Sequence, residues 1–268
     1  MDVEENRSHW LQAVYLKKLL FGGLLARFAE FAAPGQCMGC GCYVSGEMLC
    51  GRCVGRVNFS DSSWCDHCAM PPGSEHMAGC SQTDELFCER LLPWIEVRTI
   101  GGYGGMLRQA CLIGKKGHGA WACRQLVSYW LKSNKGWLMA KRPIWVVPIP
   151  RHWGRAWIHG HDPAEALAEE LARQMGSKEI RQGNFLKRQK ATPHLAELTS
   201  RQRFELMREV FVCREKAAES LAKISSVLLV DDILTTGATA MAAASALKLA
   251  GARKIYLAAM ARTLERVD

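Results

Sequence analysis

The stretch VLLVDDILTTGATA, residues 227–240, carries the pattern on which the interpretation of the whole chain depends. Four apolar residues lead into Asp231 and Asp232. A turn of small and hydroxyl residues follows, formed by Thr235, Thr236, Gly237, Ala238 and Thr239. The apolar run predicts a buried strand, and the residues after the turn predict a helix that ends at Gly251. Small residues ahead of a helix let backbone N–H groups converge on an anion, so we expect a phosphate-binding turn here.

Strand and helix patterns alternate from residue 93 to the C-terminus. The expected strands lie within residues 97–105, 143–150, 225–232 and 254–262, and the expected helices within residues 106–117, 121–132, 163–175 and 239–252. Strands that alternate with helices at this spacing predict an α/β fold with a parallel sheet covered on both faces. Ligands of such sheets bind at the carboxyl ends of the strands, which is where the two acids and the turn are expected.

The neighbouring carboxylates restrict what the turn can bind. Asp231 and Asp232 would repel a phosphate placed directly against them, so they must face hydroxyl groups or a metal-bound part of the ligand. A sugar phosphate satisfies both conditions, because its phosphate occupies the turn while its ring hydroxyls reach the acids. The residues therefore predict a site for a phosphorylated sugar.

The same residues resemble the signature of the phosphoribosyltransferase family, in which an apolar strand and two acids precede a T-T-G-x-T turn. The match runs from Leu228 to Ala240. The resemblance implies that the site takes phosphoribosyl pyrophosphate (PRPP) together with Mg2+. It further implies that Asp231 and Asp232 bind the ribose hydroxyls and that residues 235–239 hold the 5′-phosphate.

Cysteines are concentrated near the N-terminus in C-x2-C pairs. Two thiolates separated by two residues can bind one zinc ion from a single turn, and a second pair completes a tetrahedral shell. The first two pairs have zinc-ribbon-like spacing and consist of Cys37, Cys40, Cys50 and Cys53. Disulfides would require an oxidising compartment, and we find no export signal. Four sulfur ligands leave no position for a substrate, so we expect a structural zinc ion.

A second metal site is incompletely defined by the sequence. Three further cysteines could supply sulfur ligands: Cys65, Cys68 and Cys80. The fourth ligand stays open among Cys88, His67 and His76, and the number of zinc ions, one or two, stays open with it. Cys42 lies beside the first cluster and could replace one of its members.

With the cysteine module ahead of the α/β domain, the chain resembles the ComF/GntX-like group of phosphoribosyltransferase-domain proteins. The resemblance begins near Gln36 and includes elements in matching order: Tyr103, Lys115, residues 146–150, Gly160, residues 188–192, Leu198 and Arg203. We predict an N-terminal amphipathic helix (1–34), a zinc-ribbon-like module (35–92) and a phosphoribosyltransferase-like domain (93–268). The resemblance implies a cytoplasmic role in natural transformation, with single-stranded DNA and DNA-uptake or recombination proteins as partners.

The chain departs from the group where the pyrophosphate would bind. The group usually carries a basic loop ending in R-G-F-N-Q, whereas this chain has IHGHDP at residues 158–163 and keeps only Gly160 of that ending. The change removes amide donors, and Asp162 adds a negative charge. Four basic residues are candidates for this loop: Lys115, Arg151, Arg155 and His161. We therefore leave open whether the chain is an active transferase, and the sequence assigns no catalytic residue.

The net charge of +9 is concentrated in residues 91–268, which hold 28 basic and 15 acidic residues. Such an excess favours a polyanionic partner, either a phosphorylated metabolite or nucleic acid, although a solvated basic surface has the same composition. Trp145, Trp153 and Trp157 could stack on bases. For Trp153 and Trp157 the alternative is that they pack their loop onto the core.

The apolar residues 10–34 are interrupted by charges, including Lys17 and Lys18, and therefore predict an amphipathic helix and not a signal peptide. Two roles stay open for this helix, packing against the rest of the chain and peripheral contact with a membrane. Because no run of 18 uninterrupted apolar residues occurs, we expect no transmembrane span.

Overall fold

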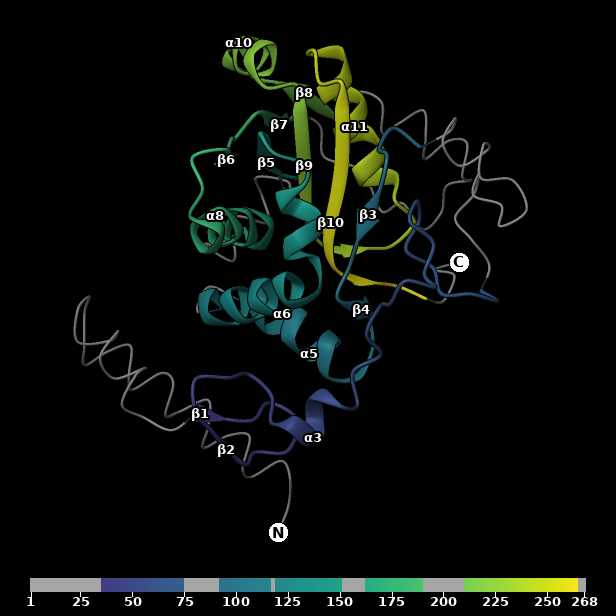
Figure 1. Ribbon diagram of the computed structural model, residues 1–268, viewed down its shortest axis with the longest axis vertical. Coiled ribbons are helices and arrows are strands. Elements are labelled where there is room, and N and C mark those ends of the chain that lie inside the picture. The colour runs from purple at the N-terminus through teal and green to yellow at the C-terminus, as the bar shows by residue number, and fades with distance from the viewer. Residues whose placement is uncertain (1–34, 75–91, 117–118, 151–161, 190–209, 265–268) are drawn as a thin grey trace, which may run out of the picture. The chain divides into compact units, whose positions relative to one another are not determined.

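The computed structural model describes residues 35–74, 92–116, 119–150, 162–189 and 210–264 (Figure 1). The chain divides into two compact units, Met1–Gly55 and Arg56–Asp268. The helix predicted for residues 1–34 lies outside the described residues.

The described part of the first unit is short and rich in turns. β1 (Gly35–Gln36) and β2 (Tyr43–Val44) form an antiparallel pair, and α3 (Gly51–Val54) is a single helical turn. Gly41 and Gly46 have φ values of 74° and 70°, a conformation that glycine adopts without steric cost. The two turns therefore depend on glycine at these positions.

The second unit contains a six-stranded parallel sheet with the strand order β3-β10-β9-β5-β6, and β4 is a further partner of β10. The strands are β3 (Val97–Arg98), β4 (Gly101–Gly102), β5 (Ile144–Pro148), β6 (Ile180–Gln182), β9 (Ser226–Leu234) and β10 (Lys254–Arg262). All the strand pairs of this sheet run parallel. The predicted α/β class with a parallel sheet is thus confirmed.

The two longest strands lie at the centre because their sequences are apolar on both faces. Residues 227–230 of β9 are fully buried, and every residue of β10 after Lys254 is buried. A strand covered on both faces has a continuous apolar run in place of alternation. β9 and β10 pair from Ser226 opposite Lys254 to Leu234 opposite Arg262, and this ladder forms the core of the sheet.

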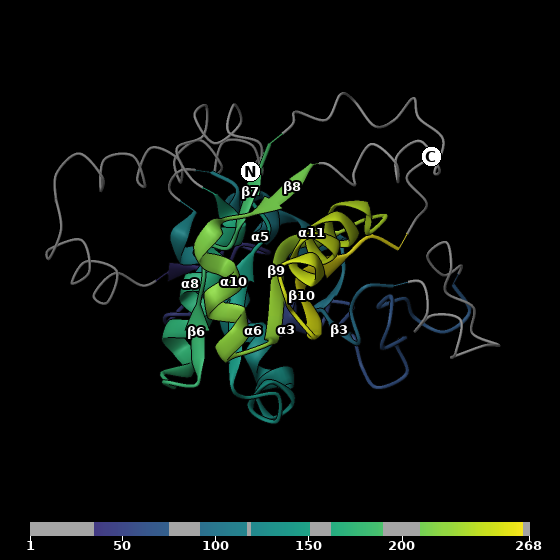
Figure 2. The ribbon, with the colours of Figure 1, turned by 90° about the horizontal axis from the view of Figure 1, so that it is seen from above.

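Helices cover both faces of the sheet. One face packs against α5 (Gly105–Gly114), α6 (Ala120–Met139) and α8 (Pro163–Met175). The other face contributes Val147, Val227 and Leu229 to one apolar cluster with α10 (Glu215–Lys223) and α11 (Ala238–Leu249). The antiparallel pair β7 (Leu186–Arg188) and β8 (Phe211–Cys213) packs against α11 (Figure 2).

Residues 56–74 form hydrogen bonds with the sheet and belong to the second unit. Phe59 forms an antiparallel bridge with Gly101, and the N–H of Gly102 donates to the carbonyl of Asn58 at 3.0 Å. A Cβ atom at Gly101 would lie 1.9 Å from the Asn58 oxygen, so this close approach requires glycine. The boundary predicted after residue 92 stays a prediction, because residues 75–91 lie outside the described part of the chain.

The bounds of the longer elements follow the sequence patterns closely. α8 and β10 have the expected ends, and Asp162 starts α8 by accepting a hydrogen bond from the N–H of Ala164 at 3.0 Å. α6 continues to Met139, beyond the expected end at residue 132. We did not predict α10. We also did not predict β6, β7 and β8, because a strand of three residues is too short to show a period. Of the helices described here, none is long and apolar enough to cross a membrane.

Candidate functional site

β5 and β9 are neighbours in the sheet, and the strands that follow them in the chain lie on opposite sides of this pair. From β5 the chain continues through α8 to β6 on one side, and from β9 it continues through α11 to β10 on the other. Such a switch point is the usual place for a ligand crevice in an open α/β sheet. The last residue of β5, Pro148, pairs with Val230, so residues 231–234 of β9 extend past it.

Asp231 and Asp232 occupy this extension and lie within β9, which ends at Leu234, two residues beyond the end that the sequence predicted. The strand continues because Ile233 and Leu234 still pair with β10. Adjacent residues of a strand point to opposite faces, so the two carboxylates leave the backbone in different directions. Asp232 is buried at 8% exposure, and its N–H donates to Oδ1 of the half-buried Asp231 at 2.9 Å. This bond holds the Asp231 carboxylate against the backbone at the end of the strand.

The predicted phosphate-binding turn connects β9 to α11. Thr235 and Thr236 are exposed, and Gly237 precedes α11 with a φ of 78°, a conformation that favours glycine. The N–H of Ala238 lies 3.5 Å from Oγ1 of Thr236. Within the described ranges, no backbone carbonyl accepts a hydrogen bond from the N–H groups of Thr235, Thr236 and Gly237. The first N–H groups of a helix such as α11, which include that of Thr239, also lack partners within the helix.

Of the four basic residues predicted to bind pyrophosphate, the structure describes Lys115. Its Nζ atom lies 3.2 Å from Oδ2 of Asp232, so the end of α5 brings a cation to the acids of β9. The other three, Arg151, Arg155 and His161, lie outside the described residues.

Trp145, the described member of the three tryptophans considered for base stacking, is partly buried and packs against the apolar core. Its ring meets that of Phe185 edge to face with centroids 5.0 Å apart, and its Nε1 donates to the carbonyl of Ser220 at 3.3 Å. Trp153 and Trp157 fall in the part of the chain that is not described.

In the first unit, the sulfur atoms of Cys37, Cys40, Cys50 and Cys53 all lie within 4.8 Å of one another. Zinc–sulfur bonds of about 2.3 Å in a tetrahedral shell place neighbouring sulfurs about 3.8 Å apart. The Cys40 and Cys50 sulfurs are 3.7 Å apart, which fits this shell. The predicted cluster of four cysteines is therefore present and could hold a metal ion such as zinc.

The backbone around this cluster favours the thiolate form of two of its members. Burial raises the pKa of the Cys37 thiol, but backbone N–H groups of Cys50, Cys40 and Gly39 more than offset this effect, so the pKa is lowered. The N–H of Cys53 lowers the pKa of Cys50 to about 6. Thiolates are the form of cysteine that binds metal, so the backbone contacts of Cys37 and Cys50 suit zinc coordination, whereas burial raises the pKa of Cys53 to about 12.

The third cysteine pair, Cys65 and Cys68, forms the same kind of turn as the first pair, Cys37 and Cys40. In the first turn, the N–H of Gly41 donates to the carbonyl of Cys37 at 2.8 Å. The N–H of Cys37 donates to the carbonyl of Cys42 at 2.7 Å. In the turn at Cys65, the N–H of Ala69 donates to the carbonyl of Cys65 at 2.8 Å. The N–H of Cys65 donates to the carbonyl of Met70 at 2.9 Å. Gly41 and Ala69 hold equivalent positions, and both have positive φ, at 74° and 52°. This conformation is uncommon for alanine, so the surrounding structure must stabilise the second turn.

The remaining ligands of a second metal site are only partly described. Cys68 is fully buried, and Nδ1 of His67, in the same turn, is buried without a hydrogen-bond partner among the described residues. The other candidates, Cys80, Cys88 and His76, lie outside the described part of the chain. The turn thus has the backbone of a metal-binding pair, while the completeness of its ligand set stays a prediction.

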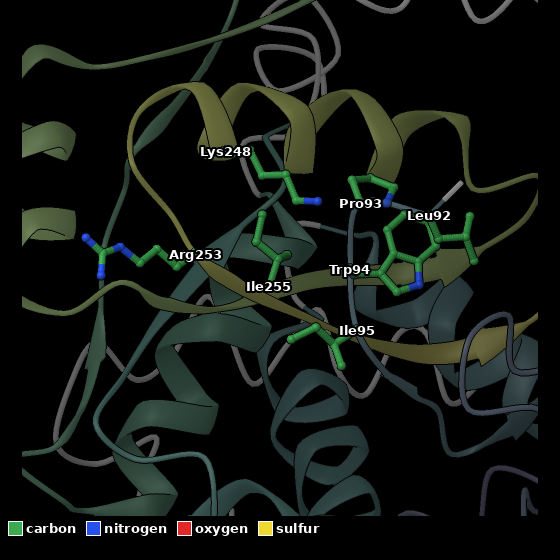
Figure 3. A pocket seen from close by; sticks show the side chains of 7 residues that line it. All are labelled: Leu92, Pro93, Trp94, Ile95, Lys248, Arg253 and Ile255. Atoms are coloured by element: carbon green, nitrogen blue, oxygen red, sulfur yellow. The ribbon is translucent and has the colours of Figure 1, made fainter. Parts of the chain in front are cut away.

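A pocket of about 300 Å3 lies at the opposite end of the sheet (Figure 3). Its lining includes Trp94 and Ile255, and Lys248 points toward it from α11. Ile255 pairs with Val227, four residues before Asp231 along β9, so the pocket is separate from the turn. None of the predicted site residues lines this pocket.

Arg262 contacts the turn and was not singled out from the sequence. It is 4% exposed, and it donates hydrogen bonds to the carbonyls of Leu234 and Thr235, directly before Thr236. The available signal was a charged residue at the end of an otherwise apolar strand, because such a residue must find hydrogen-bond partners when it is buried.

The chain is similar to a known protein over most of its length. The chain is 24% identical over 236 residues to Competence protein F of Haemophilus influenzae, and the match covers 87% of this chain and 93% of that protein. No protein-family model matches the chain. The similarity over most of the chain supports the ComF-like interpretation of the sequence.

Proposed function

We propose that the chain is a ComF-like protein with a PRPP-type ribose-phosphate site, which assists the uptake or processing of single-stranded DNA in natural transformation. The observation that carries the proposal is the position of Asp231, Asp232 and the small-residue turn at the switch point of a parallel sheet. The similarity to Competence protein F supports the role in competence.

In this proposal the two parts of the site bind different parts of the ligand. The 5′-phosphate lies against residues 235–239. Here the N–H groups of Thr235, Thr236 and Gly237 donate to no backbone carbonyl of the described residues, and the N-terminus of α11 attracts an anion. Asp231 and Asp232 accept hydrogen bonds from the ribose hydroxyls. Bound Mg2+ would neutralise charge on the pyrophosphate, and Lys115 is placed to add a second positive charge beside the acids.

We assign a structural role to a zinc ion held by the four cysteines of the first unit. Their spacing fits a closed sulfur shell, which leaves no position for substrate. Single-stranded DNA would contact the basic surface of residues 91–268, with phosphate contacts as the main source of affinity.

The sugar-phosphate site is tested by titrating the full-length protein with PRPP and Mg2+ in a calorimeter. We expect saturable binding that is lost when Asp231→Asn and Asp232→Asn are combined. Asp61→Asn is the matched control, because Asp61 is an exposed acid whose side chain bonds locally to Ser63. Wild-type protein that binds no PRPP would contradict the proposed site.

The DNA partner is tested by measuring affinity for single-stranded DNA over a range of salt concentrations. Phosphate contacts release counterions, so the logarithm of the affinity should fall linearly with the logarithm of the salt concentration. An affinity independent of salt, or no binding at low salt, would contradict a DNA-binding role.

The second candidate function is an active PRPP-dependent phosphoribosyltransferase on an unidentified acceptor. The Lys115–Asp232 pair favours it, because a cation beside the acids is suited to a departing pyrophosphate. This function predicts release of pyrophosphate when an acceptor is added. Binding of PRPP without release in the presence of candidate acceptors would favour the first function.

A further inference from the structure

Arg262 is the last residue of β10, and its guanidinium group lies inside the protein. Its hydrogen bonds include four to backbone carbonyls: Cys68, Leu234, Thr235 and Thr263. Nε lies 2.8 Å from the Cys68 oxygen, and Nη1 lies 3.0 Å from the Leu234 oxygen. A guanidinium group is costly to bury unless its donors are satisfied, and these carbonyls satisfy several of them.

Two of the four acceptors belong to consecutive peptide groups at the start of the turn. In a planar trans peptide, the C=O and the following N–H point in opposite directions. The C=O groups of Leu234 and Thr235 both point to Nη1 of Arg262. The N–H groups of Thr235 and Thr236 must therefore both point away from the buried guanidinium. Successive N–H groups directed to one side form an anion-binding concavity.

The orientation of these peptides determines the sign of the potential that a ligand meets. If either peptide rotated by half a turn, a carbonyl oxygen would replace an N–H group and would repel a phosphate. The Leu234 carbonyl has a second donor, the N–H of Thr263 at 3.0 Å, whereas Arg262 is the described donor to the Thr235 carbonyl. The peptide between Thr235 and Thr236 thus depends most on the arginine.

We propose that Arg262 is a positioning residue that holds the Leu234 and Thr235 carbonyls inward, so that the N–H groups of Thr235 and Thr236 face the anion. The inference rests on the proposed function only in that the turn binds a phosphate group. Arg262 acts through the backbone and does not contact the ligand. The Cys68 carbonyl accepts a hydrogen bond from Nε on the other side of the guanidinium group. Arg262 therefore connects the turn formed by residues 65–70 to the anion-binding turn.

The test compares three variants of the full-length protein: Arg262→Met, Arg262→Lys and Arg253→Met. Arg253 is exposed just before the start of β10, so it is the matched control. Calorimetry is carried out with two separate probes, PRPP with Mg2+ and inorganic phosphate. We expect both Arg262 variants to bind both probes on the order of 10- to 100-fold more weakly, and the control to bind as the wild type does.

Arg262→Lys separates positioning from simple attraction. Lysine keeps the positive charge but lacks the planar fork of donors that can hold several carbonyls at once. Loss of affinity in this variant supports positioning, whereas affinity within twofold of the wild type would overturn it. Amide exchange of the β9 core is measured in parallel, because a folded sheet shows that the loss of binding is not due to unfolding.

A measurement on the wild type keeps the inference testable even if both variants unfold. Added phosphate should shift the amide NMR signals of Thr235 and Thr236, and phosphate binding without these shifts would overturn the inference. Phosphate binding without PRPP binding would contradict the proposed function alone. Wild-type PRPP binding that Arg262→Met leaves unchanged would contradict this inference alone, and binding of neither probe would contradict both.

Discussion

The Nζ atom of Lys115 lies 3.2 Å from Oδ2 of Asp232, so the end of α5 and the end of β9 meet through one ion pair. The Asp232 side chain is 12% exposed and the Lys115 side chain 30%, so the pair is partly shielded from water. An ion pair in this setting is screened less than one at the surface. The contact places a cation beside the acids proposed to bind ribose.

Replacement of Lys115 by methionine should weaken PRPP binding by about tenfold, because the ligand would lose one charge-assisted contact. Calorimetry with PRPP and Mg2+ measures the change. Lys116→Met is the matched control, since Lys116 is the exposed neighbour with the same side chain. Equal losses in the two variants would show that Lys115 contributes only to the general positive charge.

The four-cysteine cluster should bind one zinc ion, and replacement of Cys40 by serine should remove it. Metal analysis of the purified protein gives the zinc content per chain. Cys42→Ser is the control, because Cys42 is an exposed cysteine next to the cluster that is not one of its four members. If Cys42→Ser also loses zinc, then Cys42 takes part in the metal shell.

The turn formed by residues 65–70 should hold a second zinc ion, because its hydrogen bonds match those of the turn formed by residues 37–42. We expect two zinc ions per chain in the wild type and one in Cys65→Ser. Cys213→Ser should retain both, since Cys213 is half-buried and its sulfur faces the carbonyl of Ala246. A wild-type protein with a single zinc ion that Cys65→Ser keeps would contradict the second site.

The sequence predicted those parts of the molecule whose residues are close together in the chain. The turn at Thr235 and the cluster at Cys37 follow from local spacing, and the central strands follow from apolar runs that only a covered sheet can accommodate. A resemblance to a family drew attention to Lys115, although its spacing gave no sign of the contact with Asp232.

The rest depends on contacts between distant residues, which local patterns do not contain. Arg262 reaches Cys68 only because β10 passes beside residues 56–74 in the folded sheet. The similarity of the turns at Cys37 and Cys65 lies in backbone hydrogen bonds, and the alanine at position 69 conceals it because glycine is the residue expected there. The three-residue strands likewise form by pairing with partners and not by their own periodicity.

Glu96 joins the start of β3 to the end of α6, and its removal should destabilise the sheet. Its Oε1 lies 2.6 Å from Nζ of Lys141, and its Oε2 accepts from Nε1 of Trp137 at 2.5 Å and lies 3.2 Å from Nη2 of Arg98. Lys141 also lies over the ring of Trp137, with Nζ 5.6 Å from the centroid. Glu96→Gln leaves these donors without a charged acceptor, and we expect a loss of about 1–3 kcal/mol in the free energy of unfolding.

The contribution of Glu96 should disappear in acid. Burial raises the pKa of Glu96, but the hydrogen bonds from Lys141 and Trp137 outweigh it and lower the pKa below its ordinary value. A carboxyl group with a lowered folded pKa stabilises the protein above its unfolded pKa of about 4.3, and the effect is lost as the pH falls through the folded value. Denaturant unfolding of wild type and Glu96→Gln should therefore differ at pH 7 and converge below about pH 4. The control is Glu179→Gln, which removes an exposed partner of Arg142. Its free energy of unfolding should match that of the wild type within about 0.5 kcal/mol at every pH. A difference between wild type and Glu96→Gln that stays constant down to low pH would show that packing and not charge explains the effect of Glu96.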